Sequence, residues 1–198
     1  MRHCLAQDSD LVPLASTQAT MTFPSIDDDL AAHLKSIYAS YRHTVDIDAK
    51  GAFFSPSCYQ ICRPNPSFAA TSRGTIVRYL HEHAAKNNST TPKKRGFYTI
   101  RPLRDAEYEF GTDEQVAPAG FSSALEVRNK AIKEGWFGMR VDLWDERSED
   151  GANNAGDLLV KVQYWWRKED GVWTQIFHDI VYIGPRDGTE GIDGEILE

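Results

Sequence analysis

Three long segments in the C-terminal half, at 136–145, 158–168 and 173–184, alternate apolar and polar residues and are joined by turn-rich stretches. Alternation with a period of two is typical of a β-strand that buries one face. The second connection contains Asp170 and Gly171, a pair that favours the tight turn of a hairpin. The sequence therefore predicts an antiparallel meander, and the rest of the chain must cover at least one face of that sheet.

The residues before these strands follow a helical pattern. From Leu30 to Val45 apolar side chains recur every three or four residues, after Ser25 as a candidate N-cap and an acidic first turn. Asp48 is then well placed to cap a short second helix. The other expected elements are shorter: an edge strand within 59–68, a helix at 75–85, strands at 96–101 and 105–111, and a helix or pocket-closing loop at 123–133.

This order, helices first and strands second, predicts the α+β class, with about three N-terminal helices packed against a mostly antiparallel sheet. A chain of 198 residues is long enough to build one hydrophobic core. We expect a single domain at 25–185, a flexible N-terminal arm at 1–24, and a mobile, acidic, glycine-rich tail at 186–198.

Charge and cysteine content exclude several classes of partner. A formal net charge of -7 argues against nucleic acid or an anionic membrane surface, because both select clustered cations. Cys4, Cys58 and Cys62 give an odd count without zinc-type spacing, so free thiols are expected. Neither a secretory signal nor a membrane span is evident in the apolar pattern, which predicts a cytoplasmic protein.

No motif for a cofactor or metal is present in the sequence. There is no glycine-rich phosphate loop, no GxSxG, no HExxH and no CxxC. His81 and His83 are two residues apart on an expected helix, which points them to different faces. We therefore expect neither a cofactor nor a metal ion.

Alternation also assigns the long strands' side chains to two faces. The inward face carries Met139, Val141, Leu143, Val160, Val162, Tyr164, Ile176, His178, Ile180 and Tyr182. The other face mixes charged residues with Trp144 and Trp165. Two exposed tryptophans favour a homodimer through this outer face, unless long charged side chains cover them.

Several short patterns carry a resemblance to a known family. They are Tyr38, Tyr41 and Asp48 around the first helix, Arg63 and Pro64 after a strand, Gly74 before TIVRYL, and the closing GVWTQIFHDIVYIG. With the order of elements over 27–184, these patterns resemble the nuclear-transport-factor-2-like superfamily, and within it the SnoaL-like branch. The resemblance implies a cone-shaped fold, in which helices wrap around a strongly curved sheet and leave an apolar cavity at the open end.

Members of that superfamily include ketosteroid isomerase, scytalone dehydratase, limonene epoxide hydrolase and polyketide cyclases, together with proteins that only bind or dimerise, so fold alone does not decide function. Its enzymes transfer protons in a dry pocket, with a carboxylate or histidine as base and tyrosines near the developing negative charge.

His178 is the best candidate for a general acid or base, because alternation places it between Ile176 and Ile180 on the apolar face. Tyr98 and Tyr59 are candidate oxyanion donors, and Asp46 is a candidate to orient His178 if the fold brings them together. The structural alternative is a core histidine with satisfied nitrogens, packing tyrosines, and aspartates that cap helices.

The substrate is expected to contact a further set of inward-facing or mouth residues. Arg63, and also Arg101, can neutralise an acidic ligand group at the mouth, unless they form salt bridges instead. The expected substrate-binding residues are Tyr38, Tyr108, Tyr164, Arg63, Met139, Val141, Val162 and Ile180.

Three functional interpretations remain open from the sequence. The leading one is a cofactor-independent lyase, isomerase or cyclase that acts on a hydrophobic polyketide-like or terpenoid-like substrate in natural-product biosynthesis. The second is a non-catalytic module of the same fold that binds a ligand or dimerises. The third is a protein-transport adaptor like the founding member of the superfamily.

Overall fold

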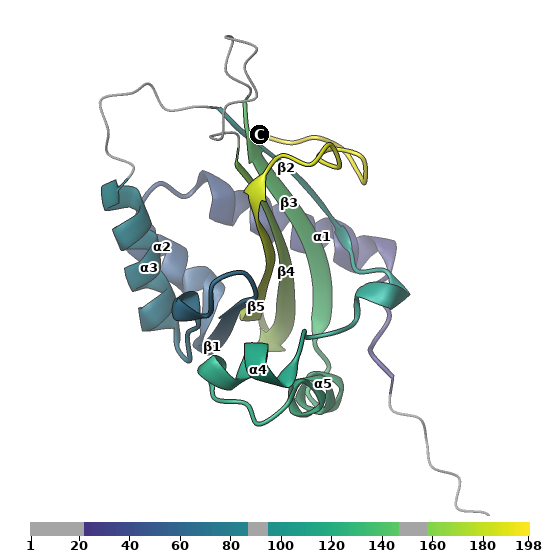
Figure 1. Cartoon of the computed structure of the whole chain (residues 1–198). Helices are drawn as coiled ribbons and strands as arrows, with labels where there is room; N and C mark the ends of the chain where they lie inside the picture. Colours follow the sequence, from purple (N-terminus) through teal and green to yellow (C-terminus); the bar gives the residue numbers. More distant parts are fainter. Residues whose placement is uncertain (1–21, 87–94, 147–157) are drawn as a thin grey trace, which may run out of the picture.

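The computed structural model describes residues 22–86, 95–146 and 158–198, and in it one curved sheet carries the fold (Figure 1). Its strand order is β1-β5-β4-β3-β2, with β1 parallel to β5 and the other pairs antiparallel. The strands are β1 (Phe54–Cys62), β2 (Gly96–Pro102), β3 (Phe137–Asp145), β4 (Leu158–Glu169) and β5 (Val172–Pro185).

The β3-β4-β5 meander is confirmed. Its hairpin turns at Asp170 and Gly171, whose φ angles of 49° and 86° lie in the left-handed region that such a turn requires. The predicted fold class, an α+β domain with a mostly antiparallel sheet, is confirmed as well.

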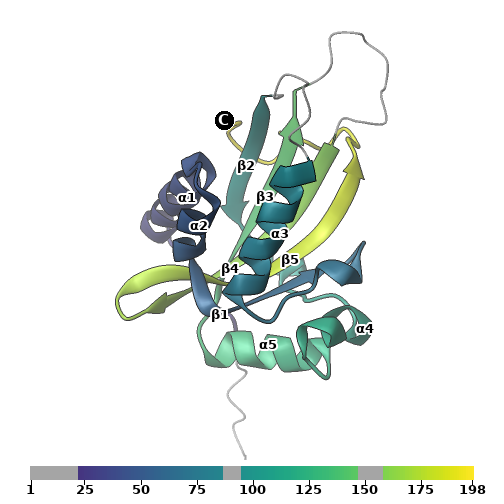
Figure 2. The same cartoon turned by 90° about the vertical axis from the view of Figure 1, so that its left-hand side faces the viewer.

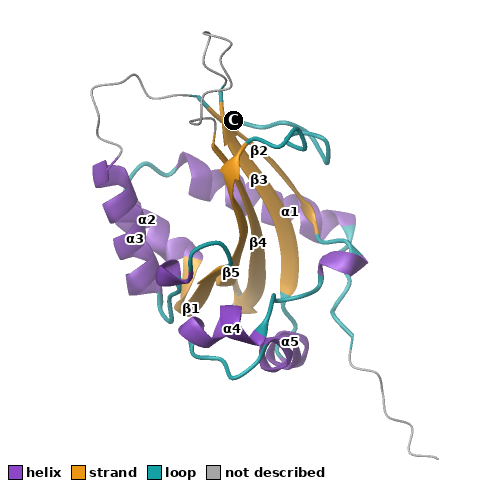
Figure 3. Ribbon diagram, viewed as in Figure 1, coloured by secondary structure: helices purple, strands orange, loops and turns teal. Residues whose placement is uncertain are grey.

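Helices cover both faces of this sheet (Figure 3). They are α1 (Asp28–His43), α2 (Ile47–Lys50), α3 (Arg73–Lys86), α4 (Asp113–Val116) and α5 (Ala124–Lys133). In Figure 2, α3 lies in front of the sheet, α1 and α2 lie beside it on the left, and α4 and α5 lie at its lower end. We call the side covered by α1 and α3 the inner face and the opposite side the outer face.

The first helix begins later than the sequence pattern predicted. Asp27, not Ser25, is its N-cap, because the Asp27 carboxylate accepts a hydrogen bond of 2.8 Å from the Leu30 amide. The apolar face predicted from periodicity is correct, with Leu34, Tyr38 and Tyr41 buried against the sheet. The helix ends at His43, two residues before the predicted Val45, which is exposed and does not belong to the apolar face.

The cap of the second helix also differs from the prediction. Asp46 caps α2 and accepts hydrogen bonds from the amides of Asp48 and Ala49, at 2.8 and 3.2 Å. Asp48 instead pairs with His81 at 3.0 Å on the exposed surface. Asp46 is therefore occupied as a helix cap.

Two bulges in β5 break the alternation used to assign faces. The partners of Val162 and Lys161 are Ile180 and Tyr182, so Val181 is an extra residue and Tyr182 leaves the inner face. A second register shift, between the pairs of Trp165 and Trp166, makes Ile176 extra in the same way. The inward positions predicted for Tyr182 and Ile176 are therefore wrong, whereas His178, between the bulges, keeps its inward position.

The outer face has a core of its own beneath α4 and α5. This outer cluster consists of Ile61, Leu103, Phe110, Val116, Ala119, Phe121, Val127, Ala131, Trp136, Trp165, Ile176 and Phe177. Phe23 and Phe110 pack on Trp165, at ring-centroid distances of 5.5 and 4.6 Å. The helix predicted at 123–133 is thus α5, and it covers the outer face instead of closing the pocket.

The expected exposure of the two outer tryptophans is wrong. Trp165 is 0% exposed under the outer cluster, and Trp144, 6% exposed, stacks on Phe97 at 6.2 Å. The sequence argument for a dimer through exposed tryptophans therefore loses its basis, because the chain's own segments bury both side chains.

The predicted strand at 105–111 is also wrong. Residues Asp105–Glu107 form one turn of 3-10 helix instead. The Glu107 carboxylate accepts a hydrogen bond of 2.8 Å from the Arg104 amide and pairs with Arg101 at 2.6 Å, which favours the turn over an extended strand.

The C-terminal segment, predicted to be mobile, packs on the sheet. Leu197 and Tyr98 exchange two backbone hydrogen bonds, at 2.9 and 2.8 Å, at the free edge of β2. Asp193 pairs with Arg104 at 2.7 Å, and Asp187 pairs with Lys161 at 2.8 Å. Residues 1–21 of the predicted arm lie outside the described residues, while Phe23 is anchored in the outer cluster.

Removing residues 186–198 is expected to destabilise the domain by about 1–3 kcal/mol, since it removes the two backbone hydrogen bonds to Tyr98 and several ion pairs. Chemical denaturation of the full chain and of the 1–185 chain measures this difference. Glu195→Gln, a change at an exposed tail side chain, is the matched control and is expected to alter stability by less than about 0.5 kcal/mol. Equal stabilities of the full and shortened chains would contradict the expectation.

Candidate ligand-binding pocket

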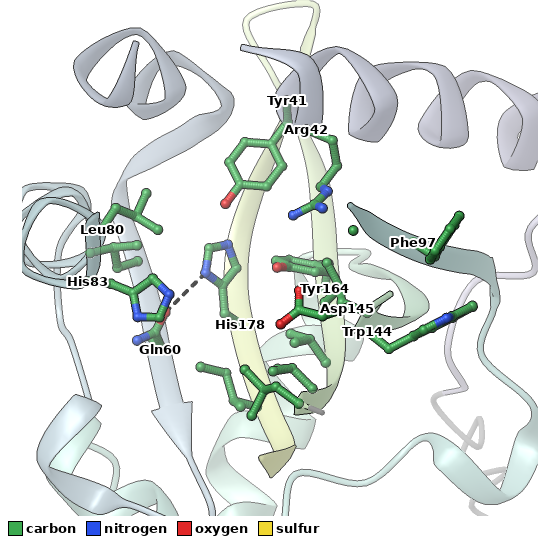
Figure 4. A pocket seen from close by; sticks show the side chains of 17 residues that line it. Tyr41, Arg42, Gln60, Leu80, His83, Phe97, Trp144, Asp145, Tyr164 and His178 are labelled. Atoms are coloured by element: carbon green, nitrogen blue, oxygen red, sulfur yellow. Dashed lines mark hydrogen bonds between the residues drawn. The ribbon is translucent and has the colours of Figure 1, made fainter. Parts of the chain in front are cut away.

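A pocket of about 350 Å³ opens between the inner face of the sheet and helices α1 and α3 (Figure 4). This volume lies within the range of small-molecule sites, roughly 300–1,000 Å³. Most of its wall is apolar, and its polar groups come from six different elements. The lining side chains used below are Tyr41, Arg42, Gln60, Leu80, His83, Leu143, Asp145, Val160, Val162, Tyr164, His178 and Ile180.

His178 lies on the inner face of β5, where the sequence placed it, and is 4% exposed. Its Nδ1 is 3.4 Å from Oε1 of Gln60, and its Nε2 is 2.7 Å from Oε1 of Gln175. The rings of Tyr164 and Phe54 pack edge-on against it, at 4.9 and 5.1 Å. Two side-chain amides and two aromatic rings therefore hold the imidazole in place.

The Gln60 amide determines which nitrogen of His178 carries the proton. Gln60 donates from Nε2 to the Phe68 carbonyl at 2.7 Å, so its Oε1 faces His178 and accepts from Nδ1–H. Nε2 of the neutral imidazole is then an acceptor. A half-turn of the Gln175 amide exchanges its oxygen and nitrogen, so that the amide N–H donates to Nε2 of His178. The same half-turn gives a partner to the Gln175 Nε2, which otherwise has none among the described residues.

Burial lowers the pKa of His178 from 6.5 to about 3. The imidazole is consequently neutral at physiological pH, and the one proton that it keeps, on Nδ1, is too weakly acidic for a general acid. As a base it is weak in the empty pocket, and it gains basicity only where a negative charge develops beside the imidazolium.

A cluster of four tyrosines surrounds the inner end of the pocket. The ring of Tyr38 lies 5.2 Å from Tyr164, 5.4 Å from Tyr98 and 5.7 Å from Tyr41. Burial raises the pKa of all four hydroxyls, so they stay protonated and can donate hydrogen bonds to an oxygen. Tyr41 and Tyr164 line the pocket, and Tyr38 and Tyr98 pack behind them in the core.

Arg42 is a pocket residue that the sequence analysis missed. It lies on α1, four residues after Tyr38, and Figure 4 shows its guanidinium pointing into the pocket. Its positive charge opposes the effect of burial on the pKa of Tyr38, Tyr41 and Tyr164. The i, i+4 spacing from Tyr38 was the one signal in the sequence that could have found it.

The structure brings together only part of the predicted site. His178, Tyr164, Val162 and Ile180 line the pocket, whereas Met139, Val141, Tyr38 and Tyr98 belong to the core behind it. The catalytic and binding roles of these residues stay predictions.

The remaining predicted site residues lie elsewhere. Tyr59 and Tyr108 pack against the outer cluster, because Tyr59 points away from the pocket and the segment around Tyr108 is a loop. Asp46 is the exposed cap of α2. Arg63 pairs with Asp179 and Glu109, at 2.5 and 2.7 Å, on the outer face.

Arg101, the other candidate at the mouth, pairs with Glu107 at 2.6 Å and with Asp193 at 3.3 Å. The salt-bridge alternative is therefore the correct interpretation for both Arg63 and Arg101.

Cys58 and Cys62 are buried free thiols as predicted, and Cys4 lies outside the described residues. Within the described ranges, no three metal-ligating side chains form a cluster, and no helix is long and apolar enough to span a membrane.

A curved α+β sheet with helices and a pocket on its inner face defines the class of cone-shaped proteins that the sequence suggested. The family model of the SnoaL-like domain matches residues 23–198, so the chain belongs to this family. The predicted membership of the SnoaL-like branch is confirmed. No curated protein matches the chain.

Solved structures similar to this chain have low sequence identity. Aln2 from a Streptomyces species is 13% identical, with a TM-score of 0.49 over 80% of this chain and 93% of that one. An NTF-2 like protein from Shewanella oneidensis is 11% identical, with a TM-score of 0.44 over 78% and 98% of the two chains. A ketosteroid isomerase-like protein from Erwinia carotovora atroseptica is 12% identical, with a TM-score of 0.42 over 76% and 89%.

Proposed function

We propose that the chain binds a small, largely apolar molecule in this pocket and acts on it without a cofactor, as a lyase, isomerase or cyclase. A polyketide-like or terpenoid-like compound of natural-product biosynthesis is the proposed substrate. The observation that carries the proposal is the position of His178, a neutral imidazole facing an apolar pocket whose other polar groups include tyrosine hydroxyls and Arg42. The proposed location is the cytoplasm.

The proposed chemistry is abstraction of a proton from a carbon next to a carbonyl group. The substrate displaces the Gln175 amide from Nε2 of His178, and this nitrogen then accepts the proton. The electron pair of the C–H bond moves to the carbonyl oxygen to give an enolate. Tyr41 and Tyr164, the tyrosines that line the pocket, supply hydrogen bonds for that oxygen. The charge that develops there stabilises the imidazolium and so raises the pKa of His178 during the reaction.

A specific observation favours the alternative, a module that binds the ligand without converting it. Amides flank both ring nitrogens of His178, and no described carboxylate contacts the ring, so the usual acid partner of a catalytic histidine is missing.

A second copy of the chain stays the proposed protein partner. Ile192 and Ile196 are the exposed apolar side chains that the tail offers for it on the outer face.

Exchange of the α-hydrogens of 2-tetralone in D₂O, followed by NMR, separates enzyme from binding module. The native chain is expected to accelerate exchange, and His178→Gln is expected to reduce that acceleration at least about 100-fold while 2-tetralone still binds. Arg78→Met, a change at an exposed arginine outside the pocket, is the matched control. Binding without accelerated exchange would leave the binding module as the better description.

A further inference from the structure

Arg42 differs from the arginines of the sheet in having no carboxylate partner among the described residues. Arg63, Arg101 and Arg140 each pair with a carboxylate, at 2.5, 2.6 and 2.7 Å. Arg42 is half-buried, yet in the described part of the chain it forms no ion pair, and its buried Nε makes no hydrogen bond. Within the described residues its guanidinium makes one cation–π contact, with the Tyr98 ring, whose centroid is 5.7 Å from the guanidinium carbon.

An arginine guanidinium stays charged in proteins, so Arg42 keeps its positive charge in this position. Removing a cation from water without a counter-charge is unfavourable, so buried arginines are normally paired. The guanidinium points into the pocket, where a bound molecule can approach its N–H groups (Figure 4). The missing counter-charge is therefore best supplied by a ligand.

The surroundings specify the chemistry of that ligand. Tyr41 and Tyr164 line the pocket near Arg42 and present hydroxyls that stay protonated. The rest of the wall includes Leu80, Leu143 and Val160, which suit a ring system or a branched chain.

We infer that the pocket selects a hydrophobic carboxylic acid, whose carboxylate binds the Arg42 guanidinium while its apolar body lies against the wall. An arginine fork matches a carboxylate in a two-pronged geometry that a neutral amide cannot reproduce. The inference rests on the proposed function, because it names the substrate class of the same pocket, and Arg42 determines specificity for that class.

Two probes that differ only in charge test the inference: 2-naphthoate and 2-naphthamide, titrated calorimetrically at pH 7.5. The native chain is expected to bind the carboxylate at least about tenfold more tightly than the amide, equivalent to about 1.4 kcal/mol. Arg42→Met is expected to abolish this preference and to leave naphthamide affinity unchanged. Arg42→Lys keeps the charge but loses the two-pronged geometry, so its preference for the carboxylate is expected to lie between those of the native chain and Arg42→Met. Arg78→Met is the matched control and is expected to keep the native preference.

The outcomes separate the inference from the proposed function. Equal binding of both probes to the native chain, or a carboxylate preference that survives in Arg42→Met, would overturn the inference and leave the pocket as a binding site. Failure of both probes to bind would overturn both. Because Arg42 has no ion pair to lose within the described chain, Arg42→Met is expected to keep the native melting temperature, which shows that any loss of affinity is local.

Discussion

Replacing Arg63 by Met is expected to destabilise the protein by about 3–5 kcal/mol at pH 8, the cost of leaving a buried charge without its partner. Asp179 is 0% exposed and accepts two close hydrogen bonds from the Arg63 guanidinium, at 2.9 and 2.5 Å. Methionine keeps the length of the apolar stem, so the change removes the charge with little loss of packing. Denaturant titration at fixed pH measures the difference.

The pH dependence of this penalty identifies its cause. Burial raises the pKa of Asp179 from 3.8 to about 6 even with Arg63 present, and removal of the guanidinium raises it further. The carboxyl of the Arg63→Met variant therefore takes up its proton already above about pH 6, and the penalty is expected to shrink as the pH falls from 8 towards 6. A penalty that is equal at pH 8 and pH 5 would mean that packing, and not charge, is what Arg63 contributes. Arg78→Met, at an exposed pair with Glu82, is the control and is expected to cost less than about 0.5 kcal/mol.

This ion pair also explains how a feature of the outer face supports the pocket. Arg63 follows β1 directly, and Asp179 is the β5 neighbour of His178. The pair thus holds the end of β1 against β5, in the register that places Gln60 opposite His178. Arg63, which the sequence analysis predicted to bind the ligand, instead positions β1, the strand that carries the pocket residue Gln60.

The fold was predictable because its main elements carry strong periodicity. Helical spacing places Leu34, Tyr38 and Tyr41 on one face of a helix, and strand spacing places Val141 and Val162 on one face of the sheet. Each set can therefore be buried in only one orientation of its element. Helix starts were less predictable, because Asp27 and Asp46 compete as N-caps with Ser25 and Asp48, each two residues away. The segment 105–111 failed for a related reason: the Arg104 amide and Arg101 both bind the Glu107 carboxylate, and that turn outweighs a weak alternation.

The site was less predictable because its geometry depends on two kinds of event that leave no local signal. Bulges at Ile176 and Val181 shift the side-chain alternation, so His178 was assigned correctly and Tyr182 was not. Long-range partners are equally invisible: Gln60 meets His178 across 118 residues of sequence, and no pattern around Gln60 marks it. Arg42 was overlooked because a lone charge at the edge of an apolar helix face usually points to solvent.

Acid is expected to destabilise the native protein more than its His178→Gln variant. The unfolded chain binds a proton at this histidine below about pH 6.5, whereas burial lowers the pKa of His178 in the folded chain to about 3. Between these values the unfolded state holds more protons, so the free energy of unfolding falls as the pH falls. The expected loss attributable to His178 is on the order of 1 kcal/mol per pH unit through this window.

The comparison with His178→Gln isolates this effect from that of Asp179, whose sign is opposite. The raised pKa of Asp179 means that the folded chain takes up a proton first, so this carboxyl adds stability as the pH falls from about 6 towards 4. Asp179 is present in both proteins, and its contribution cancels in their difference. Unfolding free energies measured from about pH 7.5 to pH 4.5 should therefore converge for the two proteins, with the native chain losing its advantage below about pH 6.5. Parallel curves would show that the imidazole is solvated in the folded state. A solvated His178 exchanges protons freely with water, and it is then not the neutral, desolvated base on which the proposed chemistry depends.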